Sequence, residues 1–187
     1  MKDEAELLAA IRGGAVDEFA ELVARHQDAV FAILGRYERN PHTIEDLAQE
    51  AFLKAWRALD RFDGRVPFAH WLARITTRVA LDHLRRRRRQ PPQLELETLG
   101  HEALDWLRAE SPAGEPAAEA ARVLLDQALQ QLSAEEQLVL TLLELEDRTV
   151  QETAQLTGWS SVWVRVRAHR ARRKLARILT QLRGPSP

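Results

Sequence analysis

Apolar residues recur along most of the chain at spacings of three and four, the period that gathers side chains on one face of an α-helix. The stretch from Val16 to Arg36 is the first clear example, with a broad apolar stripe that should bury one face. No segment alternates polar and apolar residues convincingly, as a half-buried strand would. The pattern therefore predicts an all-α protein.

Two more helices are predicted before residue 91. Thr43 is placed to cap the first, which has acidic residues in its opening turn and should end near Leu59. The segment RFDGRVP then reads as a loop, with Pro67 at the first position of a helix that ends at Pro91. The apolar face of that helix consists of Phe68, Trp71, Leu72, Ile75 and Val79, and its other faces carry His70, Arg74, Thr77, Arg78 and Arg85.

The C-terminal third predicts a series of helices, two of which open with a capping box, a hydroxyl residue followed three positions later by glutamate. A short helix stops at Gly158, and a long basic helix follows it. This order of short helix, glycine turn and long basic helix is typical of a helix-turn-helix. The predicted elements are a helix over 123–131, one over 133–145 capped by Ser133 and Glu136, a short one opened by Thr149 and Glu152, and one over 161–182 capped by Ser160.

Charge is segregated along the chain, although the formal net charge is only -1. Residues 61–90 are mainly basic, residues 93–121 are acidic apart from Arg108, and no acid follows Trp159. The acidic stretch also contains proline, glycine and alanine, so it reads as a flexible linker with room for a brief helical turn. The expected organisation is two small helical domains, 1–91 and 121–187, joined by the linker 92–120, with the helix-turn-helix in the C-terminal domain.

The composition suits this division, because 187 residues that are 45% hydrophobic are enough for two separate cores. The chain has no cysteine and no long apolar run. Its N-terminus, MKDEAELLAA, is acidic where a signal peptide would be basic and then apolar. We therefore expect a soluble cytoplasmic protein without disulfides and without membrane insertion.

The long basic helix is the strongest candidate for a binding site. A recognition helix presents donors to base edges in its N-terminal half and cations to phosphates farther along. The alternative is a solvated basic helix that packs through Val164, Leu175 and Ile178. DNA binding is predicted because the capped helix, the glycine turn and the basic helix coincide. The candidate contacts are Ser161, Val162, Trp163, Arg165, Arg167, Arg170 and Arg172, with His169, Arg173 and Lys174 near them.

The loop RFDGRVP and the helix after it form a second candidate site. Unpaired nucleic acid is held by aromatic faces and a cationic track, and a flipped base needs a pocket such as a loop over a rigid helix provides. Phe62 and His70 are candidate contacts, whereas Phe68 and Trp71 belong to the apolar stripe. By itself, the arginine run 85–89 is equally typical of a localisation signal or a solvated helix end.

Asp46, Gln49 and Glu50 form a polar surface on the helix before that loop. A solvated face is the default interpretation, and a protein contact is the alternative. Carboxylates at helical spacing also suit a metal, but no second carboxylate and histidine pair completes such a site. The sequence has no phosphate-binding glycine loop and no nucleophile with a base, so no enzyme activity, cofactor or metal is expected.

Two segments, 44–89 with the motif EDLAQEAF and 128–175 with GWSSVWVRVRAHR, resemble the two conserved domains of bacterial RNA polymerase sigma factors of the extracytoplasmic-function (ECF) group. The resemblance covers most of the chain and includes the order and separation of the motifs. It implies a promoter-melting domain (region 2), a linker and a helix-turn-helix domain (region 4), in an initiation factor that performs no covalent chemistry. The implied partners are core RNA polymerase, promoter DNA as duplex and as unpaired strand, and an anti-sigma factor.

The resemblance also implies a role for each candidate residue. Asp46, Gln49 and Glu50 would dock on the clamp coiled coil of the largest polymerase subunit. The acidic linker would thread through the nucleic-acid channels of the polymerase, and the last domain would bind the flap. Contacts to the minus-ten element would be Arg61, Phe62, Asp63, Arg65, His70, Arg74, Arg78, Arg85 and Arg86, and contacts to the minus-thirty-five element would be Ser161, Val162, Trp163, Arg165, Arg167, Arg170 and Arg172.

Two positions depart from the family pattern. Arg78 stands where the family usually has asparagine, which would strengthen phosphate contact at the expense of reading a base edge. Trp163 stands where the family has a small residue, and three roles are open for it: contact with a thymine methyl, packing on a partner protein, or displacement of the helix from its usual docking. An ordinary helix-turn-helix regulator is the alternative function, but it does not explain EDLAQEAF or the loop and helix after it. A helical metalloenzyme, a third class, would require bound metal.

Overall fold

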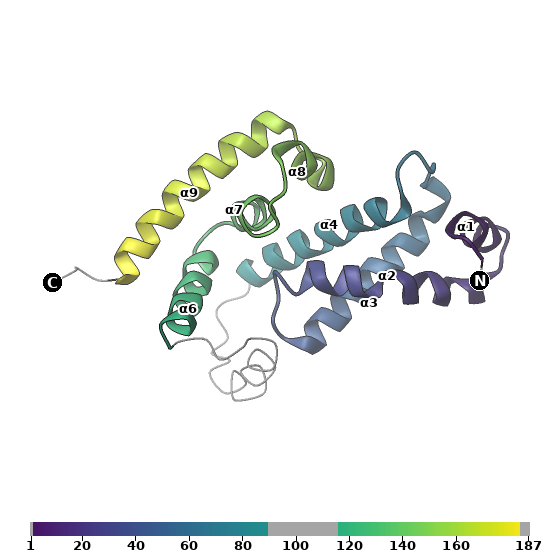
Figure 1. Cartoon of the computed structure of the whole chain (residues 1–187), viewed down its shortest axis with the longest axis horizontal. Helices are drawn as coiled ribbons and strands as arrows, with labels where there is room; N and C mark the ends of the chain where they lie inside the picture. The colour runs from purple at the N-terminus through teal and green to yellow at the C-terminus, as the bar shows by residue number, and fades with distance from the viewer. Residues whose placement is uncertain (1, 90–115, 184–187) are drawn as a thin grey trace. The chain divides into compact units, whose positions relative to one another are not determined.

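The computed structural model describes residues 2–89 and 116–183, which are helical almost throughout (Figure 1). Within these ranges there is no strand, which confirms the all-α prediction. The chain divides into two compact helical units, Met1–His83 and Leu84–Pro187. The α-helices are α1 (Glu4–Arg12), α2 (Phe19–Leu34), α3 (Pro41–Ala58), α4 (Phe68–Arg89), α6 (Pro116–Gln130), α7 (Ala134–Leu140), α8 (Val150–Thr157) and α9 (Ser161–Arg183).

Much of the predicted linker 92–120 lies outside the described residues, which resume at 116. Helix α6 begins inside that range, at Pro116, earlier than the expected start at 123. Proline is well suited to a helix start because its fixed φ matches the helix and its missing N–H has no partner there in any case.

Two helix starts in the N-terminal unit differ from the sequence prediction. Helix α1 has no counterpart in it, although Asp3 and Glu6 form a full capping box at its start. Helix α3 begins before Thr43, because the Asn40 side chain accepts hydrogen bonds from the backbone N–H groups of His42 and Thr43. Thr43 therefore lies inside the helix and does not cap it.

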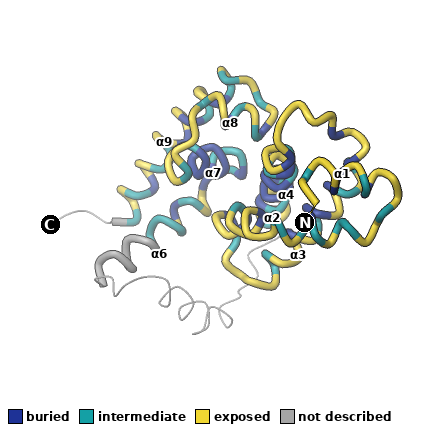
Figure 2. The backbone as a smooth tube through the Cα atoms, turned by 45° about the vertical axis from the view of Figure 1, so that its right-hand side comes forward, coloured by how far each residue is buried: buried dark blue, intermediate teal, exposed yellow. Residues whose placement is uncertain are grey.

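The N-terminal unit buries one face of each of its long helices. Leu72 of α4 lines the same small hollow as Val30 and Ile33 of α2, which shows that these two helices pack together. The buried positions of α4 are drawn in dark blue in Figure 2. Each fully buried valine, leucine or phenylalanine side chain contributes roughly 1.5 to 3 kcal/mol of transfer free energy. The largest such side chains in this unit are Leu7, Leu22, Val30, Leu34, Phe68 and Val79.

Glu38 ties the loop between α2 and α3 to α4. One carboxylate oxygen accepts hydrogen bonds from the N–H groups of Arg39 and Asn40 at 2.7 and 3.0 Å, and the other lies 2.7 Å from His83 Nε2. The side chains of Glu38 and His83 are only 14% and 13% exposed. The loop that presents Asn40 as a helix cap is thereby fixed to α4.

In the C-terminal unit, α9 packs on α6, α7 and α8. Val164 and Ala168 in its first half lie against Val139 of α7. Ala171 and Ile178 in its second half belong to the cluster that includes residues of α6. Helix α7 is buried over most of its length (Figure 2).

Both predicted capping boxes of this unit are present, Ser133 with Glu136 at the start of α7 and Thr149 with Glu152 at the start of α8. Helix α8 ends at Gly158, whose φ of 76° is left-handed and favours glycine. The predicted glycine turn is therefore confirmed.

The flanking turns complete the helix-turn-helix. Helix α7 ends at Leu140, and a π-helical turn, η3 (Thr141–Leu145), covers the rest of the range predicted for it. Helix α9 begins at Ser161 as predicted, with the Trp163 N–H 3.2 Å from Ser160 Oγ.

Candidate nucleic-acid and protein-binding surfaces

Helix α3 presents a polar surface on its exposed side. Asp46 and Gln49 are exposed, whereas Glu50 is partly buried and lies 2.7 Å from Lys54 Nζ, one helical turn along. Lys54 Nζ also lies 3.9 Å from the carboxylate of Asp82 on α4. Asp46 and Gln49 are therefore the members of the predicted set most available to a partner, while Glu50 holds Lys54.

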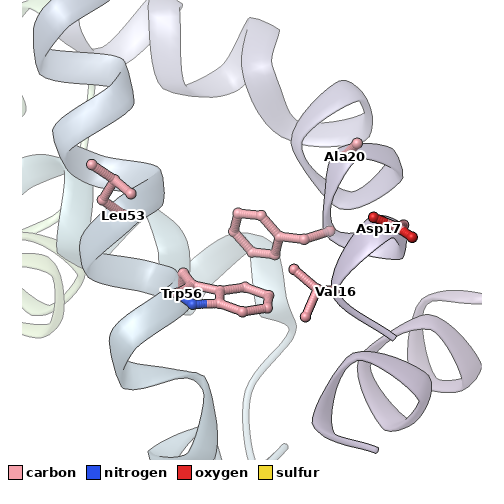
Figure 3. A pocket seen from close by; sticks show the side chains of 6 residues that line it. Val16, Asp17, Ala20, Leu53 and Trp56 are labelled. Atoms are coloured by element: carbon pink, nitrogen blue, oxygen red, sulfur yellow. The ribbon is translucent and has the colours of Figure 1, made fainter. Parts of the chain in front are cut away.

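An open apolar hollow of about 470 Å³ lies between α3 and the start of α2 (Figure 3). Val16 and Phe19 line one side, and Leu53 and Trp56 of α3 line the other. Val16 and Leu53 are 58% and 54% exposed, and the rings of Phe19 and Trp56 meet edge-on with centroids 4.8 Å apart. Leu53 follows Gln49 by one helical turn, so the hollow continues the polar surface along α3. The hollow was not predicted from the sequence, because its two sides come from separate elements.

The loop after α3 is anchored at both ends by aromatic rings. The Phe62 ring lies 5.6 Å from the Phe68 ring and 5.2 Å from the Trp71 ring, centroid to centroid. Phe68 and Trp71 pack as predicted, but Phe62 differs from its predicted role as a base contact, because it is only 6% exposed. Burial among other rings gives Phe62 a supporting role under the loop.

The tip of this loop is exposed and charged. Arg61, Asp63 and Arg65 all face solvent. The Asp63 carboxylate accepts a hydrogen bond from the Arg65 N–H at 3.1 Å and lies 3.2 Å from Arg65 Nε. Gly64 between them has a φ of 72°, so the turn requires the left-handed conformation there. The loop is thus a short exposed turn of fixed conformation, supported from below by packed aromatic rings.

Arg12 of α1 holds the start of the loop. Its Nη2 donates hydrogen bonds to the carbonyl oxygens of Leu59, at 3.0 Å, and of Phe62. The guanidinium carbon also lies 5.9 Å from the centre of the Phe62 ring. The Leu59 carbonyl also accepts a hydrogen bond from the Phe62 N–H at 3.1 Å, so Arg12 is its second donor. The helix missed by the sequence analysis therefore supports a predicted site.

The exposed side of α4 carries a stripe of polar side chains. His70, Arg74 and Arg78 are exposed and spaced four residues apart, which brings them together on one face. Thr77 was predicted to lie with these residues away from the apolar face, and that prediction is wrong. Its side chain is buried, with 2% exposed, and its hydroxyl donates to the Ala73 carbonyl at 2.8 Å. That intrahelical bond satisfies the hydroxyl and makes burial possible. The exposed cations farther along α4 are Arg85, Arg86, Arg88 and Arg89, and the first two belong to the predicted contacts.

Trp163, at the start of α9, is held from two sides. Its ring lies 4.2 Å from the Trp159 ring, centroid to centroid, and the Arg167 guanidinium carbon lies 4.5 Å from its centre. Both tryptophans also pack against the core cluster that contains Val164. The stack gives Trp163 a role inside its own domain, which was not among the three considered from the sequence.

The remaining predicted contacts on α9 fall into two groups. Val162, Arg165 and Arg170 are exposed, while Ser161 is partly buried. Arg172 is exposed but forms an ion pair with Glu144, with Nη2 at 2.5 Å and Nε at 2.9 Å from one carboxylate oxygen. A phosphate that binds Arg172 would therefore compete with the Glu144 carboxylate for the guanidinium.

Metal ligation finds no structural support in the described part of the chain. Across residues 2–89 and 116–183, no three histidine, cysteine, aspartate or glutamate side chains gather as a metal site requires. In the same ranges, no helix combines the length and the apolar character needed to cross a membrane.

Known families match both units of the chain. Residues 22–90 match the family described as Sigma-70 region 2, and residues 122–175 match Sigma-70, region 4. The first range contains most of α2 and the whole of α3, the aromatic-anchored loop and α4. The second contains the helix-turn-helix and most of α9.

Curated relatives match over almost the whole length. The RNA polymerase sigma-H factor of Pseudomonas aeruginosa is 30% identical over 185 residues, which cover 97% of this chain and 96% of that protein. The ECF RNA polymerase sigma-E factor of Escherichia coli K12 is 30% identical over 170 residues, which cover 89% and 88%. Among solved structures, CnrH in complex with the cytosolic domain of CnrY is similar, with a TM-score of 0.56, 28% identity and coverage of 92% of this chain and 94% of that one.

Proposed function

Because the chain belongs to the ECF sigma factors of bacterial RNA polymerase, a family of transcription initiation factors, we propose that it directs core polymerase to a class of promoters through the surfaces described above. The observation that carries the proposal is the match of both regions in one chain, in the order that an initiation factor needs. A helix-turn-helix regulator would require only the second region.

The division of labour follows from the chemistry of the surfaces. Asp46 and Gln49, with Glu50, form the contact to the polymerase clamp, and the hollow beside Leu53 accepts an apolar side chain of the same partner. The exposed loop captures an unpaired base above its aromatic support. The cations behind it neutralise phosphates of the melted strand. These minus-ten contacts are Arg61, Asp63, Arg65, His70, Arg74, Arg78, Arg85 and Arg86, with Phe62 as support.

The C-terminal unit binds the minus-thirty-five element as duplex. Helix α9 enters the major groove with its N-terminal half, as recognition helices do. Arg165 and Arg170 are its exposed cations there, and Arg167 is held on Trp163. Ser161 and Val162 lie at the entering end, and at Arg172 a phosphate competes with Glu144. Initiation by this chain is a binding function in the cytoplasm, without covalent chemistry, metal or cofactor.

An anti-sigma factor is the third partner in this proposal. The solved structure of CnrH contains a second protein, the cytosolic domain of CnrY. By analogy, a regulatory protein would hold this chain away from core polymerase until a signal releases it. Competition between such a protein and core polymerase for the chain is the expected behaviour.

The proposed function is tested by transcription from a library of promoters with purified core polymerase, with and without this chain. The expected result is that the chain redirects initiation to a minority of templates that share two elements at fixed spacing. If the chain neither binds core polymerase nor changes the start sites, the proposed function is wrong.

Replacing Asp46 with alanine should weaken core binding about fivefold and leave duplex binding by the chain unchanged. The effect is modest because exposed charge pairs contribute about 1 kcal/mol or less. Titration of labelled chain with core polymerase measures it. Asp28→Ala, which removes an exposed aspartate from α2, is the matched control and should bind core normally. Equal affinity of Asp46→Ala and the parent chain would remove Asp46 from the contact.

A further inference from the structure

Two valines, Val162 and Val166, form a small apolar patch on the exposed face of α9. Val162 and Val166 are 67% and 47% exposed. Each lies two positions from the buried Val164, so both point roughly 200° around the helix from the core. They are four residues apart and therefore neighbours on consecutive turns. Val162 is among the contacts predicted from the sequence, and Val166 is not.

The surroundings of this apolar patch are cationic. Arg165 lies between the two valines in sequence, and His169 and Arg170 follow on the next turn, all exposed. No acidic residue occurs after Trp159 in the whole sequence. Such a field favours a polyanion over an apolar or basic partner. The occupant of this face should therefore be a polyanion that displays a small apolar group.

Duplex DNA meets both conditions. In the major groove, the thymine 5-methyl is the apolar group that base edges present, and aliphatic side chains read it by contact. Trp163 is not free for this task, because Trp159 and Arg167 hold its ring. The exposed apolar side chains that remain on this half of α9 are Val162 and Val166.

We propose that Val162 and Val166 are specificity-determining residues that read thymine 5-methyl groups in the duplex element bound by the C-terminal unit. The inference rests on the proposed function, which supplies the duplex, and it adds the base that the helix selects. The flanking cations then set affinity and register, while the valines discriminate between sequences.

The test uses the holoenzyme formed from core polymerase and the full chain. A promoter with a randomised minus-thirty-five element is first selected for binding, and each thymine of the selected element is then replaced by uracil, which removes only the methyl group. With the parent chain, one or two of these changes should weaken binding roughly fourfold, the effect of one buried methyl. Val162→Ala and Val166→Ala should each lose most of that sensitivity at one position.

Val123→Ala is the matched control, because Val123 is 45% exposed on α6 of the same unit. It should keep the full response to uracil.

If the parent holoenzyme selects an element but is indifferent to uracil throughout, the inference is wrong while the proposed function stands. If uracil matters and the valine variants respond like the parent, the methyl is read elsewhere and the inference is also wrong. Valine variants that lose core binding without a change in the uracil response would indicate a protein contact instead. A holoenzyme that selects no element at all would overturn the proposed function and this inference together.

Discussion

Lowering the pH from 5 to 2 should remove about 3 kcal/mol of unfolding free energy from the N-terminal unit through Glu38 alone. Burial disfavours the Glu38 carboxylate, but hydrogen bonds from His83 and from the N–H groups of Asn40 and Arg39 outweigh burial and lower its pKa from 4.5 to about 2. A lowered pKa means that, as the pH falls, the folded state binds the proton at a lower pH than the unfolded state does. The stabilisation is therefore complete above pH 4.5 and is lost as the pH falls towards 2.

Glu38→Gln isolates this effect, since glutamine keeps acceptors for the Arg39 and Asn40 N–H groups but carries no charge. Between pH 5 and pH 3, the unfolding free energy of the variant should fall less than that of the parent. Most of the loss that Glu38 causes in the parent already occurs in this interval. Hydrogen exchange of peptides from residues 19–83 in the full chain measures it in the right unit. Glu45→Gln, on the exposed side of α3, should follow the parent curve. Parallel curves for Glu38→Gln and the parent would contradict the assignment.

Replacing Arg12 with methionine should slow the formation of the open promoter complex roughly tenfold, the effect of losing hydrogen bonds from a charged donor. Methionine keeps the apolar stem of Arg12 but removes its hydrogen bonds to the Leu59 and Phe62 carbonyls, of which Leu59 keeps the Phe62 N–H as a donor. The start of the loop then loses its link to α1. Because Arg12 acts through the loop, the affinity for core polymerase should stay unchanged.

Permanganate reactivity of unpaired thymines reports open-complex formation, and a separate titration reports core binding. Arg25→Met is the matched control, because Arg25 also donates to a backbone carbonyl, that of Lys2, but far along the chain from the loop. It should open promoters at the parent rate. If Arg12→Met lowers core binding and opening to the same extent, Arg12 supports the whole unit and does not position the loop.

Short sequence motifs, such as helix caps and a glycine turn, predicted much of the helical framework correctly. The capping boxes at Ser133 and Thr149 and the left-handed Gly158 involve residues within a few positions of one another, so their geometry is written in short motifs. The start of α3 was misplaced because Asn40 followed by proline is a stronger start than Thr43. Helix α1 carries its own capping box, and that signal was available in Asp3 and Glu6.

The sites depend on partners that are remote in sequence, and there the prediction was less complete. Arg172 pairs with Glu144 across 28 positions, and Arg12 reaches Phe62 across 50. The burial of Phe62 follows from its packing on the next helix, which no local pattern encodes. The stack of Trp159 on Trp163 spans only four positions, but the hydrophobic cluster on which both rings pack also includes residues of α7 and α8.

The ion pairs of α9 have a consequence for how salt should affect DNA binding. Arg172 and Lys174 already lie 2.5 and 3.1 Å from the carboxylates of Glu144 and Glu136, so part of the formal charge of the helix is neutralised before any DNA arrives. Arg165, Arg170 and Arg173 have no ion pair with any described residue and can displace counterions directly. The slope of log affinity against log salt counts displaced counterions. For this helix it should therefore be shallower than its sequence charge indicates, which leaves relatively more of the binding energy to contacts that distinguish one base from another.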